Sequence, residues 1–169
     1  LRPNDRSPAW SVKAMMDLQR KLDIDDINEI ERYLPRFIEY MFTDYCKRIF
    51  RFSWAEFTES VMANDVVTVK YEDLLRDTPA TVSGVIKRLT GKDCDMEKIQ
   101  QICAHYSFEN QTKRKAGQED TSSFLRKGIA GDWKNRFTKE TCQVFDQLGG
   151  KALIAAGYEK DHDWVNSFD

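Results

Sequence analysis

Residues 124–137 read FLRKGIAGDWKNRF and place two cations, Arg126 and Lys127, directly before a glycine, Gly128. An arginine presents a planar fork that matches the oxygens of a phosphate, and a lysine adds a compact positive charge. A glycine lets the backbone N–H approach an anion without a Cβ atom in the way. The tripeptide therefore predicts an anion clamp, although basic residues beside glycine, taken alone, are more often a solvated surface turn.

The residues around this tripeptide extend the pattern. Residues 126–138, RKGIAGDWKNRFT, resemble the RKGxxGDWKNxFT signature of the soluble sulfotransferases that use PAPS (3′-phosphoadenosine 5′-phosphosulfate) as donor. The signature positions that match are Arg126, Lys127, Gly128, Gly131, Asp132, Trp133, Lys134, Asn135, Phe137 and Thr138. The resemblance implies that Arg126, Lys127 and Gly128 contact the 3′-phosphate of the donor nucleotide.

Two other segments are similar to parts of the same family. The stretch VTVKYEDLLRD resembles the segment whose tyrosine lies near the adenine, which implies that role for Tyr71. The stretch HYSFEN resembles the family's Thr-Ser-Phe segment, whose aromatic ring packs on the purine, and Ser107 and Phe108 match it while Tyr106 replaces the threonine. Without the resemblance, Tyr71 would be interpreted as a half-buried tyrosine at the end of a strand.

The start of the chain, LRPNDRSPAWS, resembles the family's RNPxDxxxS segment, in which an arginine and a serine hold the same 3′-phosphate. Arg2 takes the arginine position. Ser11 is preferred for the serine because it lies on the helix that follows, although Ser7 also lies nearby and a serine on a helix surface often has no ligand. The resemblance therefore implies that Arg2 and Ser11 join Arg126 and Lys127 at the phosphate.

The resemblance also implies an α/β fold: the C-terminal portion of a P-loop-type sulfotransferase, helix-rich around one or two parallel strands. Residues 1–169 would form a single domain or part of one. The clearest strand is at residues 66–69, which are β-branched and apolar almost without interruption. Such continuous apolar runs are typical of strands covered on both faces.

Apolar residues recur at helical spacing along most of the remaining sequence. Pro35 lies inside one such stretch and is expected to bend or split the helix, whereas Pro79 and Gly91 mark the start and the end of another. Thr138 is expected to cap a late helix, followed by a short final piece near residues 153–154. The other expected elements are helices near residues 8–21, 27–41 and 95–106, and a long polar loop at residues 110–125.

The composition fits one ordinary domain of 169 residues, with 41% hydrophobic and 32% charged residues. The formal net charge of -2 gives no general preference for polyanions, so any anion site must be local. Four cysteines without CxxC spacing and two histidines do not predict a metal site. Reduced thiols favour a cytoplasmic setting, and neither a membrane span nor a signal peptide is expected.

The catalytic groups cannot be assigned from this sequence. In the family, the phosphate loop, the lysines that serve the leaving phosphate and the histidine base lie upstream of the arginine segment, and no phosphate loop occurs in these 169 residues. His105 is expected to be structural or solvated, and His162 lies in a polar tail that is expected to be solvated. We therefore expect a piece of a longer protein, matching roughly the C-terminal 60% of a sulfotransferase.

The leading functional prediction is a sulfotransferase that moves a sulfuryl group from PAPS to a hydroxyl or amine of a small-molecule acceptor, with this chain supplying the 3′-phosphate and adenine grip. The alternative is a non-catalytic module that binds or scaffolds 3′-phosphoadenosine compounds. Nucleic-acid binding through residues 113–115, KRK, is the weakest interpretation, because acidic residues follow and no aromatic residues interleave. Residues 134–143 depart from the family's KxxxTVxxxE dimer segment at Lys139 and Gln143, so no dimer is expected through them.

Overall fold

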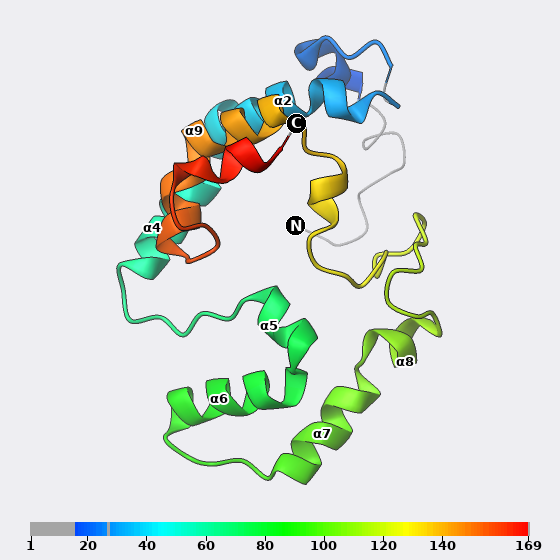
Figure 1. The fold of residues 1–169 in the computed structure, drawn as a ribbon, viewed down its shortest axis with the longest axis vertical. Helices are drawn as coiled ribbons and strands as arrows, with labels where there is room; N and C mark the ends of the chain where they lie inside the picture. The colour runs from blue at the N-terminus through cyan, green and yellow to red at the C-terminus, as the bar shows by residue number, and fades with distance from the viewer. Residues whose placement is uncertain (1–15, 27, 169) are drawn as a thin grey trace. The chain divides into compact units, whose positions relative to one another are not determined.

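The computed structural model describes residues 16–26 and 28–168. The chain divides into two compact units: a first unit of residues 1–64 and 135–169, and a second unit of residues 65–134. Most of the α-helices of both units are labelled in Figure 1. Within the described residues, every regular element is helical.

The first unit is built on α9 (Lys139–Ala155), against which α2 (Ile30–Tyr40) and α4 (Trp54–Met62) both pack. Figure 1 shows α2 alongside α9. The π-helical η1 (Met41–Tyr45) and the short α3 (Cys46–Ile49) continue from α2, and the 3-10 helix η3 (His162–Ser167) returns to contact α9. Residues 16–22 are also helical, and the rest of the helix expected at 8–21 lies outside the described residues.

An aromatic cluster joins α4 and η1 to α9. The rings of Phe42, Trp54 and Phe145 contact one another at centroid distances of 5.5–6.2 Å, in tilted or edge-to-face arrangements. A Cβ atom placed on Gly149 would lie only 3.2–3.4 Å from atoms of these three rings. The glycine in the middle of α9 therefore lets the aromatic cluster approach the helix backbone closely.

Local signals explain where α4 and α9 of the first unit begin. Ser53 and Glu56 form a reciprocal capping box at the start of α4, with Glu56 N donating to Ser53 Oγ at 3.2 Å and Ser53 N donating to Glu56 Oε2 at 2.6 Å. The predicted cap of α9 is confirmed, because Thr141 N donates to Thr138 Oγ1 at 3.2 Å. The short final piece expected near residues 153–154 is part of α9 itself.

Pro35 is expected to bend or split its helix, and the split is wrong. Pro35 is buried inside α2, which continues to Tyr40 and passes directly into the π-helical η1. A proline removes one backbone donor, and its ring here contributes to the buried face of the helix instead of ending it. The irregularity in this stretch is the π-helical η1, six residues further on.

The second unit contains four α-helices, each of which packs against the next one in sequence: α5 (Tyr71–Arg76), α6 (Thr78–Thr90), α7 (Met96–His105) and α8 (Phe108–Thr112). The 3-10 helix η2 (Asp132–Asn135) begins at the end of this unit. Asp77 caps α6 by accepting from Ala80 N at 3.0 Å, Pro79 lies in its first turn, and Gly91 ends it in the left-handed region at φ 71°. The helices predicted at 78–91 and 95–106 are confirmed. Because α8 occupies residues 108–112, the predicted loop begins at residue 113.

The strand predicted at residues 66–69 is not formed. These residues have no regular secondary structure, and Val66 and Val69 are 48% and 41% exposed. A strand requires backbone hydrogen bonds to a neighbouring strand, and none of the described segments provides one. The β-branched, apolar composition favours a strand, but the pairing that makes a strand is not a property of the segment alone.

Candidate functional site

Gly128 and Phe108, two of the residues predicted to bind nucleotide, lie against each other in the second unit. Gly128 has a positive φ of 66°, and a Cβ atom at this position would lie 2.6–2.9 Å from atoms of the Phe108 ring. Real Cβ atoms do not approach so closely, so only glycine allows this contact. The RKG segment is thereby fixed against the first residue of α8.

Ser107 has a clear local role. Its Oγ accepts a hydrogen bond from Asn110 N at 3.3 Å and so caps α8. The cap begins the helix at Phe108 and presents that half-buried ring toward Gly128. Among the predicted site residues, Ser107 therefore positions Phe108.

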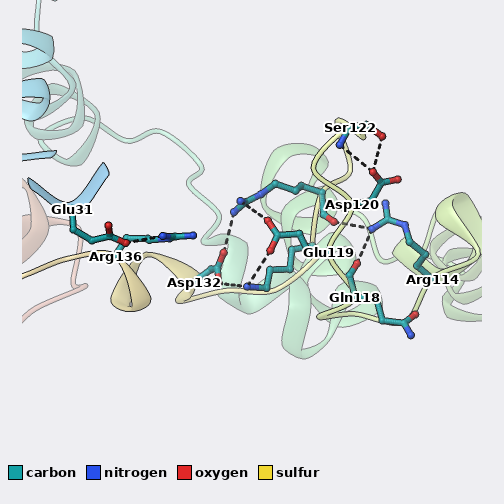
Figure 2. A network of polar contacts seen from close by, with 10 residues as sticks. Glu31, Arg114, Gln118, Glu119, Asp120, Ser122, Asp132 and Arg136 are labelled. Atoms are coloured by element: carbon teal, nitrogen blue, oxygen red, sulfur yellow. Dashed lines mark hydrogen bonds and ion pairs between the residues drawn. The ribbon is translucent and has the colours of Figure 1, made fainter. Parts of the chain in front are cut away.

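Arg126 and Lys127 both bind two carboxylates, those of Glu119 and Asp132. Arg126 Nη1 lies 2.7 Å from Glu119 Oε1, and Arg126 Nη2 lies 2.9 Å from Asp132 Oδ2. Lys127 Nζ lies 2.5 Å from Asp132 Oδ1 and 3.9 Å from Glu119 Oε2. Figure 2 shows the carboxylates of Glu119 and Asp132 in this network. We call these four side chains the charge cluster: two cations and two carboxylates, without net charge.

Arg114 holds the loop that carries the charge cluster. Its Nη1 donates to the backbone carbonyls of Gln118 and Arg126 at 2.7 Å each, and its Nη2 donates to the carbonyl of Leu125 at 2.5 Å. The guanidinium carbon also lies 5.2 Å from the centre of the Phe108 ring, within the range of a cation–π contact. Figure 2 shows Arg114 and Gln118 at this point of the loop. Arg114 therefore links two segments of the irregular loop, at residues 118 and 125–126, to the ring of Phe108.

Two backbone hydrogen bonds reinforce that link. Gly117 N donates to the carbonyl of Lys127 at 2.8 Å, and Asp120 N donates to the carbonyl of Arg126 at 3.0 Å. The carbonyl groups of Arg126 and Lys127 thus bind the backbone of residues 117–120.

Sequence reasoning missed three residues of this site. Arg114 was considered only as part of the basic run 113–115, and Glu119 and Asp132 were not considered as partners of Arg126 and Lys127. Glu119 and Asp132 lie within seven positions of Arg126, which was a usable signal, because neighbouring opposite charges on a loop can pair. The contacts of Arg114 with three carbonyls had no signal in the sequence, since they depend on how the loop closes.

The remaining predicted site residues, Tyr71, Arg2 and Ser11, are not among the residues whose contacts form the charge cluster or the packing of Gly128 on Phe108. Tyr71 is the first residue of α5, 49% exposed, and takes part in none of the hydrogen bonds or ion pairs of the charge cluster. Arg2 and Ser11 lie outside the described residues. The structure therefore brings together Ser107, Phe108 and the RKG segment.

Residues 12–157 match the family described as the sulfotransferase domain. The chain belongs to the sulfotransferase family. It is 33% identical over 89 residues to human sulfotransferase 2A1, a match that covers 47% of this chain and 31% of the relative. It is 29% identical over 119 residues to the guinea pig (Cavia porcellus) 3-alpha-hydroxysteroid sulfotransferase, covering 63% of this chain and 40% of the relative. It is also 33% identical over 98 residues to rat (Rattus norvegicus) sulfotransferase 1C2, covering 49% and 33%.

This sulfotransferase chain spans about a third of the length of the curated relatives it matches, with shares of 31–40% in these three cases. No solved structure matches the chain significantly. The match of residues 12–157 includes the whole second unit, and therefore the charge cluster.

The two histidines of this sulfotransferase chain make structural contacts. The His105 ring packs edge-to-face on Tyr106 with centroids 4.9 Å apart. His162 Nδ1 lies 2.8 Å from Asp146 Oδ2, and Trp164 Nε1 donates to Asp146 Oδ1 at 2.7 Å. The tail around His162, which was expected to be solvated, is therefore attached to α9 through Asp146, although the His162 side chain remains 56% exposed.

The remaining ionisable groups indicate no further chemistry. All four cysteines are free, and burial raises the pKa of the Cys142 thiol to about 11. In the part of the chain that the structure describes, no three His, Cys, Asp or Glu side chains are grouped closely enough to hold a metal ion. A search of the described helices finds none that is both long enough and apolar enough to cross a bilayer.

Proposed function

We propose that this chain supplies the 3′-phosphate and adenine grip of a PAPS-dependent sulfotransferase. The observation that carries the proposal is the arrangement of the RKG segment: Arg126 and Lys127 are held side by side by shared carboxylates, and Gly128 is seated on Phe108. An arginine fork beside a lysine suits a phosphate dianion. The aromatic ring next to them suits a purine base.

The proposed roles follow from these contacts. Arg126 and Lys127 bind the 3′-phosphate, Gly128 leaves its backbone N–H accessible, and Phe108 packs on the adenine. Tyr71 is proposed to lie near the adenine, Ser107 positions Phe108 through its cap, and Arg2 and Ser11 complete the phosphate site. The roles of Arg126, Lys127, Gly128 and Phe108 are supported by the signature at residues 126–138 and by the contacts of the second unit. The roles of Tyr71, Arg2 and Ser11 rest on the resemblance of their own segments alone.

The proposed reaction transfers a sulfuryl group from the 5′-phosphosulfate of PAPS to a hydroxyl or amine of a small-molecule acceptor. The bond between sulfur and the bridging phosphate oxygen breaks, a bond between sulfur and the acceptor oxygen or nitrogen forms, and the acceptor proton passes to a base. The products are 3′-phosphoadenosine 5′-phosphate (PAP) and the sulfated acceptor. The residues of this chain contribute binding and orientation of the donor, with no metal; the catalytic groups stay unassigned.

The finer fold proposal is that residues 1–169 form a single domain or part of one: the C-terminal portion of a P-loop-type α/β fold. Residues 67–69 line a cavity of about 230 Å³ together with Thr81, Gly84 and Val85 of α6. A strand of a parallel sheet lies against its following helix in the same way. We propose that residues 66–69 become a strand when another segment pairs with them.

The proposed setting is the cytoplasm, which agrees with four free cysteines. We also propose that the protein binds no nucleic acid, and that it forms no dimer through residues 134–143. Replacing the apolar residue of the family's dimer segment with Lys139 would put a charge into a small two-fold interface.

The test is binding of PAP to the full-length protein with Arg126 replaced. Arg126→Ala removes one charge-assisted contact to phosphate and is expected to weaken PAP binding about tenfold to a hundredfold in isothermal titration calorimetry. Arg88→Ala is the matched control, because Arg88 lies in the same unit and pairs with Asp65 at 2.8 Å. If the unmodified protein does not bind PAP, or if both variants lose affinity equally, the proposed grip is wrong.

A transfer assay on the same preparation separates the enzyme from the non-catalytic module. Turnover of PAPS with a phenol or an alcohol as acceptor supports the sulfotransferase. Binding of PAP without any turnover supports the module.

A further inference from the structure

The carboxylate of Glu119 lies between the two cations that the proposed function assigns to a phosphate. One of its oxygens is 2.7 Å from Arg126 Nη1 and the other is 3.9 Å from Lys127 Nζ. A phosphate that binds both cations needs the same two directions of approach, because each of its oxygens must face one of them. In this structure a side chain of the protein takes that position.

Glu119 and Asp132 are not equivalent partners. Asp132 contacts Lys127 at 2.5 Å and Arg126 at 2.9 Å, and its side chain is only 23% exposed. Glu119 makes a longer contact with Lys127, at 3.9 Å, and its side chain is 35% exposed. Asp132 therefore holds the cations at a fixed spacing, and Glu119 is the partner on the more open side.

The backbone on both sides of Glu119 is fixed. Arg114 Nη1 binds the carbonyl of Gln118 at 2.7 Å, and Asp120 N donates to the carbonyl of Arg126 at 3.0 Å. Figure 2 shows Gln118, Glu119 and Asp120 in succession within this network. Because its neighbours are held, the Glu119 side chain can leave the cations by rotation about its own bonds, a fast and local motion that leaves the loop in place.

We propose that Glu119 is a competing side chain, an internal anion that occupies the position of the 3′-phosphate until a nucleotide displaces it. This inference rests on the proposed function of the same site. Nucleotide binding then exchanges one carboxylate with a single charge for a phosphate dianion, which has more charge and more acceptor oxygens. An adenine nucleotide without a 3′-phosphate has no group that displaces Glu119, so Glu119 lowers the affinity of 3′-phosphorylated nucleotides alone.

The alternative role for Glu119 is purely structural, with its carboxylate keeping the loop in shape. The two roles predict opposite effects of removing the charge. A structural Glu119 would make its neutral variant bind every nucleotide less well. A competing Glu119 would make the same variant bind 3′-phosphorylated nucleotides more tightly.

The test compares the full-length protein with its Glu119→Gln variant, using PAP and adenosine 5′-monophosphate (AMP) as probes in isothermal titration calorimetry. Glutamine keeps the shape of the side chain and removes the charge that competes for Arg126 and Lys127. We expect PAP to bind about three- to tenfold more tightly, as two partly exposed ion pairs would allow. The affinity for AMP should not change.

Glu97→Gln is the matched control. Glu97 lies on α7, outside the charge cluster, and its substitution makes the same change in net charge. It should leave both affinities unchanged. A second arm repeats Glu119→Gln in an Arg126→Ala background, where the gain for PAP should shrink because one of the two competing pairs is already absent.

The outcomes divide as follows. Tighter binding of PAP alone, with a smaller gain in the Arg126→Ala background, supports the inference. Unchanged or weaker PAP binding, or an equal gain for AMP, overturns it while the proposed phosphate grip stands, provided that PAP binding still depends on Arg126. If the unmodified protein does not bind PAP, the proposed function and this inference are both overturned.

Discussion

Each of the two units is stabilised internally by a different kind of contact. In the first unit, Thr141, Cys142 and Ala152 on α9 are fully buried, and an aromatic cluster packs beside them. In the second unit, Ile99 is the one residue of 65–134 that is buried. The loop of the second unit, residues 113–131, is held by Arg114 and by the charge cluster. The sulfotransferase signature therefore lies mostly in the unit with fewer apolar contacts.

This difference separates permanent contacts from exchangeable ones. A large-to-small change at a packed aromatic ring, such as the half-buried Phe145, costs a few kcal/mol, whereas a partly exposed ion pair contributes about 0–1 kcal/mol. A ligand anion can replace a carboxylate in such a pair, but no ion in solution replaces the packing of a ring. Segments with few apolar contacts also open more easily, as binding loops must. The comparison leads to predictions of decreasing size.

The largest expected effect is in the aromatic cluster of the first unit. Phe145→Ala removes a ring that contacts Phe42, Trp54 and Phe137. We expect the free energy of unfolding, measured by urea denaturation of the full-length protein, to fall by about 3 kcal/mol.

Phe124→Ala is the control for this change, because the same side chain in the second unit is fully exposed at 101%. It should alter the unfolding free energy by at most about 0.5 kcal/mol. Equal losses in the two variants would show that the units do not differ as described.

The next effect concerns the cysteines. Burial raises the pKa of the Cys142 thiol from 9.0 to about 11, so at pH 8 its thiolate should be about a hundredfold scarcer than that of an ordinary thiol. Cys103, on α7 of the second unit, is only half-buried. We expect a thiol reagent such as DTNB to modify Cys103 about a hundredfold faster than Cys142 in the folded protein, with mass spectrometry identifying the site.

In denaturant the two thiols should react at similar rates, which serves as the control. The sign of the pH effect follows from the same shift: the folded state favours the neutral thiol, so this contribution to stability is complete below pH 9 and is lost as the pH rises through 11. Rapid modification of Cys142 in the native protein would contradict its burial.

The smallest of the three effects is local to the second unit. Gly128→Ala places a Cβ atom against the Phe108 ring at a residue with φ 66°, which should cost about 2 kcal/mol. Hydrogen exchange of the backbone amides should become faster at residues 113–131 while α9 keeps its protection.

Gly84→Ala provides the comparison, because no atom lies within 4 Å of a Cβ placed on this glycine of α6. An alanine inside a helix is favoured over glycine, so protection of α6 should stay the same or increase. Faster exchange throughout both units in Gly128→Ala would mean that the loop is not an independent feature.

The parts of the fold that the sequence predicts are those governed by neighbouring residues. Pro79, Gly91 and Thr138 mark helix ends because capping depends on groups within one turn. The strand at 66–69 could not be predicted reliably, because its formation depends on a partner segment. The split expected at Pro35 does not occur for a related reason: Pro35 is buried within the continuous helix α2, and that burial depends on tertiary packing.

The candidate site shows the same division. The signature identified Arg126, Lys127 and Gly128, and the structure places Gly128 on Phe108. It did not identify Arg114, whose three carbonyl partners come together only when the irregular loop closes. Residue types indicate which groups can bind an anion, whereas the contacts that hold those groups in place arise from the folded loop.

The first unit is discontinuous in the chain, and this has a consequence for its folding during synthesis. The helices α2 and α4 leave the ribosome early, but α9, against which both pack, is made only after all of residues 65–134. Until then the apolar faces of the early helices lack their native cover, and the rings of Phe42 and Trp54 stay available to chaperones or to other nascent chains. A ribosomal pause placed between residues 64 and 139 would lengthen that exposure.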